Sequence, residues 1–120
     1  MTTRAEKVLF DVKLGPCVYT VKKVHSLHSG DSSALFGICM GLDKEIQVRD
    51  GMQPQQELQT MLHELLHGII NEYCIRNAAG LESDEEEVIV DLLALGLAEA
   101  LASSPKLRRY IEQQVKQSPR

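Results

Sequence analysis

Two histidines four residues apart, with a glutamate beside the first, constrain this chain more than any other feature of its sequence. The pentapeptide His63-Glu64-Leu65-Leu66-His67 fits one face of a helix, because residues i and i+4 lie about 6 Å apart along the axis. Two neutral imidazoles at that separation can bind one Zn²⁺ at about 2.0–2.1 Å each. Glu64 then projects beside the ion, where a carboxylate can accept a proton from a bound water. The motif therefore predicts a helix that carries a catalytic zinc site.

The composition narrows the class of protein. The 120 residues suffice for one domain, residues 1–120, with an ordinary balance of 43% hydrophobic and 25% charged side chains. The net charge of −4 argues against a nucleic-acid partner, because such binding depends on neutralising phosphates. The three cysteines contain no Cys-x-x-Cys pair and do not suggest a disulfide framework, which favours the reducing cytoplasm.

No segment has the pattern of a signal peptide or of a membrane-spanning helix. Residues 1–11 lack the apolar run of a secretory signal. The longest apolar stretch, residues 88–102, contains Asp91 and Glu99 and is too short to cross a bilayer. We therefore expect a cytoplasmic protein that does not contact a membrane.

The first half of the chain predicts a small sheet. Residues 18–24 alternate in polarity and are rich in β-branched side chains, as expected of a half-buried strand. Residues 35–42 and 45–49 flank Asp43-Lys44 and predict a hairpin, which the turn Asp50-Gly51 closes. The expected result is a three-stranded, mostly antiparallel sheet.

The second half begins with the helix that carries the histidines. Pro54 suits its first turn, and Asn77–Gly80 is expected to end it. Over about 20 residues, one apolar stripe has helical spacing; its members are Leu58, Met61, Leu62, Leu65, Leu66, Ile69, Ile70 and Tyr73. His63 and His67 lie away from the centre of this stripe, so they face a second surface that another element must cover.

A second helix is predicted over about residues 84–102, after a Ser83–Glu86 capping box. It is apolar almost all round, which is typical of a helix buried between other elements. One stripe of polar and small residues allows another helix to approach closely; it consists of Glu87, Asp91, Ala94 and Ala98. A last, basic helix is expected from Ser104-Pro105 to about Gln117.

A catalytic zinc needs three protein ligands and one open position. Glu87 is the favoured third ligand, because the 19 residues that separate it from His67 can complete one helix, a turn and the start of an antiparallel partner. Asp91 follows four residues later and can accept a hydrogen bond from the second nitrogen of His63, which would fix its tautomer. The alternative for Glu87 is a solvated acid at a helix start, where the helix dipole favours negative charge.

The pattern His63-Glu64-x-x-His67 with Glu87-x-x-x-Asp91 resembles the gluzincin metallopeptidases, the thermolysin-like branch of the zincins. The chain is similar in size to minimal single-domain gluzincins and to small peptidases of the ImmA/IrrE type. The resemblance implies a zincin-like α+β fold in which a small sheet packs on the histidine-bearing helix. It also implies Zn²⁺ bound by His63, His67 and Glu87, catalysis by Glu64, orientation of a ligand by Asp91, and a peptide or protein substrate.

The resemblance leaves the oxyanion-stabilising residue open, because the C-terminal subdomain that supplies a His or Tyr in longer gluzincins has no counterpart here. His25 and His28 are read as loop residues, one of which could overhang the cleft; a second metal pair is the lesser alternative. Tyr73, Tyr110, Arg108 and Arg109 are further candidates without independent support.

Three functions remain open: an active metallopeptidase, a zinc-binding interaction domain with little or no turnover, and a latent peptidase. In the latent form the basic segment Lys106–Arg120 would cover an acidic cleft. Glu64 favours the active enzyme, since a structural zinc site needs no base and fills its fourth position with protein. An extended substrate could pair with an edge strand, either 35–42 or 45–49. The sequence does not indicate an oligomeric state.

Overall fold

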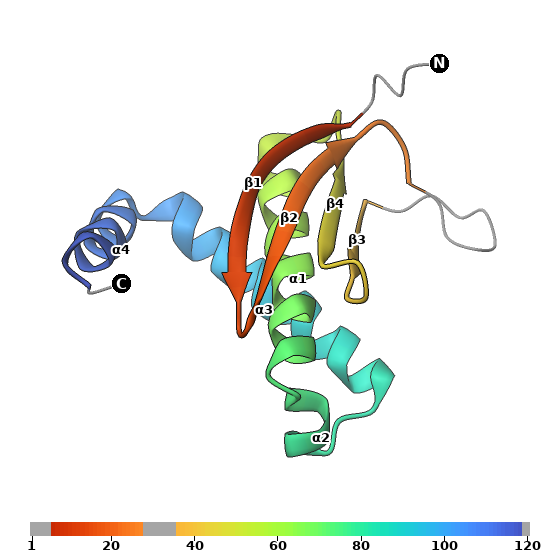
Figure 1. Cartoon of the computed structure of the whole chain (residues 1–120). Coiled ribbons are helices and arrows are strands. Elements are labelled where there is room, and N and C mark those ends of the chain that lie inside the picture. Colours follow the sequence, from red (N-terminus) through yellow and green to blue (C-terminus); the bar gives the residue numbers. More distant parts are fainter. Residues whose placement is uncertain (1–5, 28–35, 119–120) are drawn as a thin grey trace.

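A computed structural model describes residues 6–27 and 36–118, which form an α+β fold of one four-stranded sheet and four helices (Figure 1). The strands are β1 (Lys7–Leu14), β2 (Cys17–Val24), β3 (Gly37–Met40) and β4 (Glu45–Arg49). The helices are α1 (Pro54–Glu72), α2 (Ile75–Ala79), α3 (Ser83–Ser103) and α4 (Pro105–Gln117).

The sheet is mixed, with strand order β1-β2-β4-β3. β1 pairs with β2 and β3 with β4 in antiparallel fashion, whereas β2 and β4 are parallel. The expected number of three strands is therefore wrong, and the sheet is mixed, although two of its three pairings are antiparallel. β1 was missed because it is an edge strand in which only Leu14 is buried, so its sequence alternates weakly. The parallel pairing was missed because hairpin signals report only on neighbouring strands.

α1 covers one face of the sheet with the apolar stripe that the sequence predicted. Met61, Leu65 and Ile69 pack against a buried cluster that consists of Leu14, Tyr19, Val21 and Ile46. Each large apolar side chain that is fully buried in this way stabilises the fold by about 1.5–3 kcal/mol. Tyr73 does not belong to this core: it is 62% exposed, because α1 ends at Glu72 and Cys74 turns the chain away with a φ of 54°.

The connection between α1 and α3 corrects two further expectations. Gly80 ends the short helix α2 instead of α1. Its φ of 67° is left-handed, a conformation that glycine adopts more easily than other residues. The cap of α3 also lies one residue earlier than predicted: the Glu82 backbone N–H donates to Glu85 Oε1 at 2.7 Å. Glu82 and Glu85 therefore form the capping box, and Glu86 is available to turn inward.

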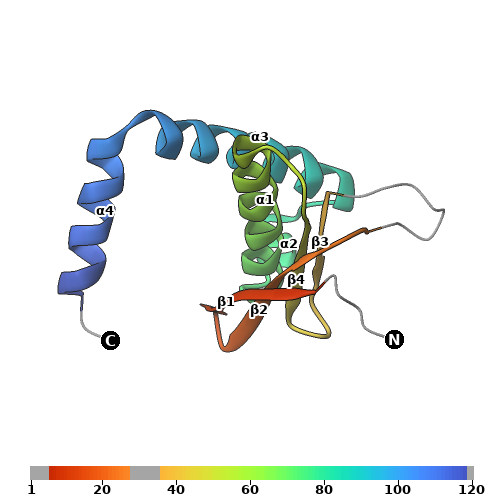
Figure 2. The ribbon, with the colours of Figure 1, turned by 90° about the horizontal axis from the view of Figure 1, so that it is seen from above.

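α3 packs on α1 through a narrow stripe with a spacing of four residues: Glu86, Val90, Ala94 and Ala98. Most of its remaining side chains are exposed, so the expectation of a helix buried on all sides is wrong. α4 bends by 99° from α3 and stands apart from α1 and the sheet, beyond the far end of α3 (Figure 2). No single helix in the described part of the chain is long and apolar enough to span a membrane; α3 and α4 together meet that test by length and composition, across their bend.

Candidate metal centre

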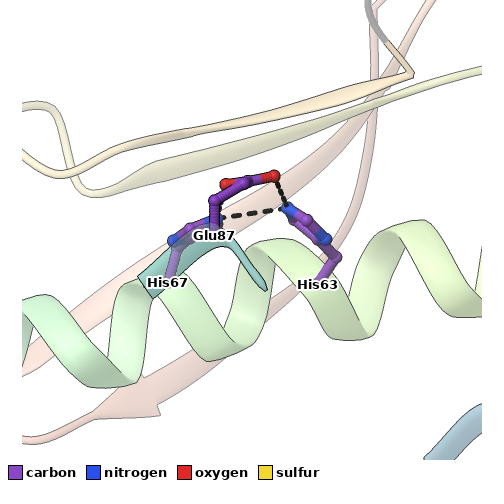
Figure 3. A group of neighbouring side chains, drawn as sticks. All are labelled: His63, His67 and Glu87. Carbon is purple, nitrogen blue, oxygen red and sulfur yellow. Dashed lines mark hydrogen bonds and ion pairs between the residues drawn. The ribbon is translucent and has the colours of Figure 1, made fainter. Parts of the chain in front are cut away.

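Three potential metal ligands from two helices converge in the structure (Figure 3). His63 and His67 come from adjacent turns of α1, and Glu87 comes from the first turns of α3. The two Nε2 atoms lie 3.1 Å apart. Glu87 reaches both rings, with Oε2 at 3.2 Å from His63 Nε2 and Oε1 at 3.0 Å from His67 Nε2.

These distances fit a zinc ion. Ligand atoms in a tetrahedral site at about 2.0–2.1 Å from the metal are roughly 3.3 Å from one another. The two nitrogens are 3.1 Å apart, and the distances of 3.2 and 3.0 Å join them to different oxygens of Glu87, so the rings would need to open slightly and the carboxylate to turn one oxygen toward the ion. Three protein ligands leave the fourth position open, which is the pattern of catalytic zinc sites.

The outer nitrogen of each histidine faces a carboxylate. His63 Nδ1 lies 3.0 Å from Asp91 Oδ1, the contact that the sequence spacing predicted, and Asp91 itself is 60% exposed. His67 Nδ1 lies 2.6 Å from Glu86 Oε2. A neutral imidazole that donates from Nδ1 carries its lone pair on Nε2. In that tautomer both lone pairs would point into the cluster beside the Glu87 carboxylate, where they could bind a cation.

Glu86 is a site residue that sequence reasoning assigned to a helix cap. Its side chain is only 7% exposed, and it also pairs with Arg76, whose Nη2 lies 2.7 Å from Oε1. Burial raises the pKa of Glu86, but the hydrogen bonds from His67 and Arg76 outweigh this effect and hold the pKa below its usual range. The four-residue spacing that links Glu86 to the buried Val90 was the available signal for its inward orientation.

Glu64 lies beside the cluster and is 8% exposed. Its pKa is raised to about 7, mainly by burial, with smaller contributions from the charges of Glu87 and Asp91. β3 passes very close to it: a Cβ on Gly37 would lie 2.7 Å from Thr60 Cγ2 and 3.1 Å from Glu64 Cγ. Gly37, which sequence reasoning did not single out, therefore allows the edge strand to approach α1.

Two adjoining cavities meet at the cluster, with volumes of about 660 and 400 Å³. Both are lined by Gly37, His63, Glu64 and Glu87. The larger one extends along β3 past Cys39, whose pKa burial raises to about 11, so that this thiol is neutral. Among the described residues β3 pairs only with β4, so its other edge is free of a strand beside the cavities, whereas β4 is paired on both sides. Of the two strands predicted as a substrate edge, only β3 remains.

The candidates for oxyanion stabilisation are not brought together with the cluster. His25 is exposed and lines neither cavity, and His28 lies outside the described residues. Neither Tyr73 nor any residue of α4, where Tyr110, Arg108 and Arg109 are found, lines a cavity within the described ranges.

Comparisons with protein-family models, with curated proteins and with solved structures found no match for this chain. The arguments about function therefore depend on the residues of this chain and on their geometry.

Proposed function

We propose that this chain is a zinc-dependent metallopeptidase of zincin-like fold that hydrolyses peptide bonds. One observation carries the proposal: the ligand atoms of His63, His67 and Glu87 converge within 4.8 Å of one another, next to the buried carboxylate of Glu64. A two-histidine, one-glutamate set with an adjacent general base matches the requirements of metal-assisted hydrolysis. We also propose a cytoplasmic location, since Cys17, Cys39 and Cys74 are unpaired.

When bound, zinc would polarise the scissile carbonyl and lower the pKa of a coordinated water. The remaining work belongs to side chains of the protein. Glu64 would accept a proton from the attacking water and pass it to the leaving amine. Asp91 and Glu86 would keep the His63 and His67 rings in the tautomer that directs each Nε2 to the metal.

The open edge of β3 supports a peptide as the substrate. An extended chain that lies along β3 could add to the sheet as a further strand, and backbone hydrogen bonds would then hold it in register. The same edge borders both cavities, so such a chain would pass directly over Glu64 and the cluster. Side chains of the substrate would alternate between the cavities and the solvent.

The two alternatives differ in their support. A zinc-binding interaction domain without turnover would share the ligands but has no use for Glu64. A latent peptidase would need α4 to lie over the cleft. Because α4 stands apart from the sheet and lines neither cavity, the second alternative lacks support from the described residues (Figure 2).

The decisive experiment compares Glu64→Gln with the native protein. Purified without added zinc, both proteins should contain equimolar zinc, whereas cleavage of a mixed peptide library should fall by about 10²–10⁴-fold in the variant. Glu112→Gln, which changes an exposed glutamate on α4, is the matched control and should cleave normally. If the native protein and the variant both bind zinc but neither cleaves the peptides, the result would favour the interaction domain. Failure to bind zinc would reject the metal centre itself.

A further inference from the structure

The outer face of α3, opposite α1, is an apolar surface that no described element covers. Its large side chains are between 39% and 65% exposed. They are Val88, Ile89, Leu92 and Leu95; Leu93 and Leu97 follow the buried Glu86 and Val90 by seven residues and belong to the side of the helix that faces α1. Single exposed apolar residues are ordinary, but a contiguous group of this size marks an interaction surface.

α4 carries a second uncovered apolar face. Tyr110, Ile111 and Val115 have the spacing of one helical stripe and are 60%, 42% and 62% exposed. Among the described residues, α3 is the one element with which α4 makes extensive contact. An amphipathic helix that projects from the body without packing its apolar face needs a partner for that face.

α4 cannot cover the outer face of its own α3. The two helices meet at 99°, so α4 leads away from that face instead of folding over it (Figure 2). Ser104 stabilises the bend, because its Oγ accepts a hydrogen bond from the Leu107 backbone N–H at 3.1 Å. Arg108 stabilises it further by donating to the carbonyl oxygens of Leu101 and Ala102.

The charges of the two helices are complementary. Of the six acidic side chains of α3, Glu86, Glu87 and Asp91 face the histidines of α1, which leaves Asp84, Glu85 and Glu99 and no basic side chain, whereas α4 contains four basic side chains and one acidic one. Two copies of α3 packed on each other would bring like charges together, and the acidic α3 would be repelled by an anionic membrane or by a nucleic acid. Packing of α4 from one copy against α3 of another would bury both apolar faces and bring opposite charges together.

We propose that this chain forms a two-fold symmetric dimer in which α4 of each copy lies on the outer face of α3 of the other copy. The exchange is reciprocal, so that both apolar faces of both chains are covered by one symmetry operation. The basic side chains of α4 then lie near Asp84, Glu85 and Glu99, the acidic side chains of α3 that do not face α1. The proposal is independent of zinc and of peptidase activity.

Sedimentation velocity over about 1–100 µM protein tests the proposal. The native protein should approach twice the chain mass of 13.4 kDa. Leu92→Glu on α3 and Ile111→Glu on α4 should each raise the dissociation constant by about tenfold or more. Val18→Glu, which places the same charge at a residue of β2 that is 57% exposed, is the matched control and should leave the dimer intact. Far-ultraviolet circular dichroism verifies that each variant is folded.

Mixing the two interface variants distinguishes reciprocal exchange from other dimers. A mixed pair contains one fully native α4-on-α3 contact, because Leu92→Glu leaves α4 intact and Ile111→Glu leaves α3 intact. The mixture should therefore associate more strongly than either variant alone. No gain on mixing, or a native protein that is monomeric at the highest concentration, would overturn the proposal. Flotation of monomeric protein with vesicles of phosphatidylcholine and phosphatidylglycerol would assign the surface to a membrane instead.

Discussion

His63 and His67 offer the same atom to the same cluster, but the protein holds the two rings in different ways. The partner of His63 is Asp91, a carboxylate that is 60% exposed on the rim of the site. The partner of His67 is Glu86, which is 7% exposed and is itself held by Arg76 of α2. The two rings themselves are similarly exposed, at 17% and 20%, so the difference lies in their supports: Asp91 borders solvent, whereas Glu86 belongs to the packed contact between α1, α2 and α3.

The difference separates two roles that a supporting carboxylate can have. At an exposed position water can replace a lost hydrogen bond, so the carboxylate mainly orients the ring. At a buried position the same carboxylate also satisfies other polar groups, and its loss leaves them without partners. Glu86 should thus affect both zinc binding and folding, whereas Asp91 should affect zinc binding alone.

The largest effect is expected when either ring is removed. His63→Ala and His67→Ala should each weaken zinc binding by more than the roughly 10–100-fold that is typical of outer partners. His67→Ala should in addition lower the stability of the metal-free protein, because Glu86 loses a buried hydrogen-bond donor. Competition with a chromogenic chelator measures the affinity, and thermal unfolding of the metal-free proteins measures the stability. A variant that keeps native affinity would remove its histidine from the site.

The next effect compares the two supporting carboxylates directly. Glu86→Gln and Asp91→Asn should both weaken zinc binding by about 10–100-fold. Only Glu86→Gln should also destabilise the metal-free protein, by about 1–3 kcal/mol, because a neutral amide cannot serve both His67 and Arg76. Asp91→Asn should stay within about 0.5 kcal/mol of the native protein. Equal losses of stability, measured by urea unfolding, would contradict the distinction between a buried and an exposed support.

A smaller effect is expected one step further from the metal. Arg76 is 53% exposed and acts on His67 only through Glu86. Arg76→Met should therefore weaken zinc binding by less than about tenfold, below the range for direct partners of a ligand. Arg76→Lys should recover part of the loss, since it keeps the charge but not the paired N–H groups. A loss as large as that of Glu86→Gln would mean that Arg76 contacts the substrate or the metal site more directly.

The same contrast explains which parts of the site could be predicted from the sequence. The spacing of His63 and His67 on one helix, and that of Glu87 and Asp91 on the next, depends only on helical periodicity, and the structure brings these four side chains together. The inward orientation of Glu86 depends instead on where α3 begins. The N-cap of α3 is Glu82, one residue before the predicted Ser83. Successive residues of a helix point in directions that differ by about 100°, so this shift changes which of Glu85, Glu86 and Glu87 faces inward.

The missed parts of the fold have a related cause. The weak pattern of β1 and the parallel pairing of β2 with β4 depend on contacts between segments distant in sequence. The close approach of Gly37 to Thr60 depends on the relative position of β3 and α1, which no local pattern encodes. For α3, the sequence shows which side chains are apolar, but not whether other elements of the same chain bury them.

The smallest effect concerns a carboxylate at the opposite end of α1, which has no metal ligand as a partner. Glu72 accepts hydrogen bonds from Tyr19 at 2.5 Å and from Lys44 at 2.7 Å. The Lys44 ammonium, followed by the Tyr19 hydroxyl, lowers the pKa of Glu72 from about 4.5 to about 2. A carboxyl group with a lowered pKa stabilises the folded state above its unfolded pKa, and this contribution is lost as the pH falls toward the folded value.

Glu72→Gln should therefore lower the thermal stability of the metal-free protein at pH 7, and its difference from the native protein should shrink as the pH falls from about 4.5 to about 2. Glu112→Gln is the exposed control and should show no such convergence. Zinc affinity at pH 7 should be unchanged in both variants, since neither side chain is a member of the cluster of His63, His67 and Glu87. If Glu72→Gln weakened zinc binding as strongly as Glu86→Gln, the zinc losses would reflect general loosening of α1, and the assignment of Glu86 as the support of His67 would fail.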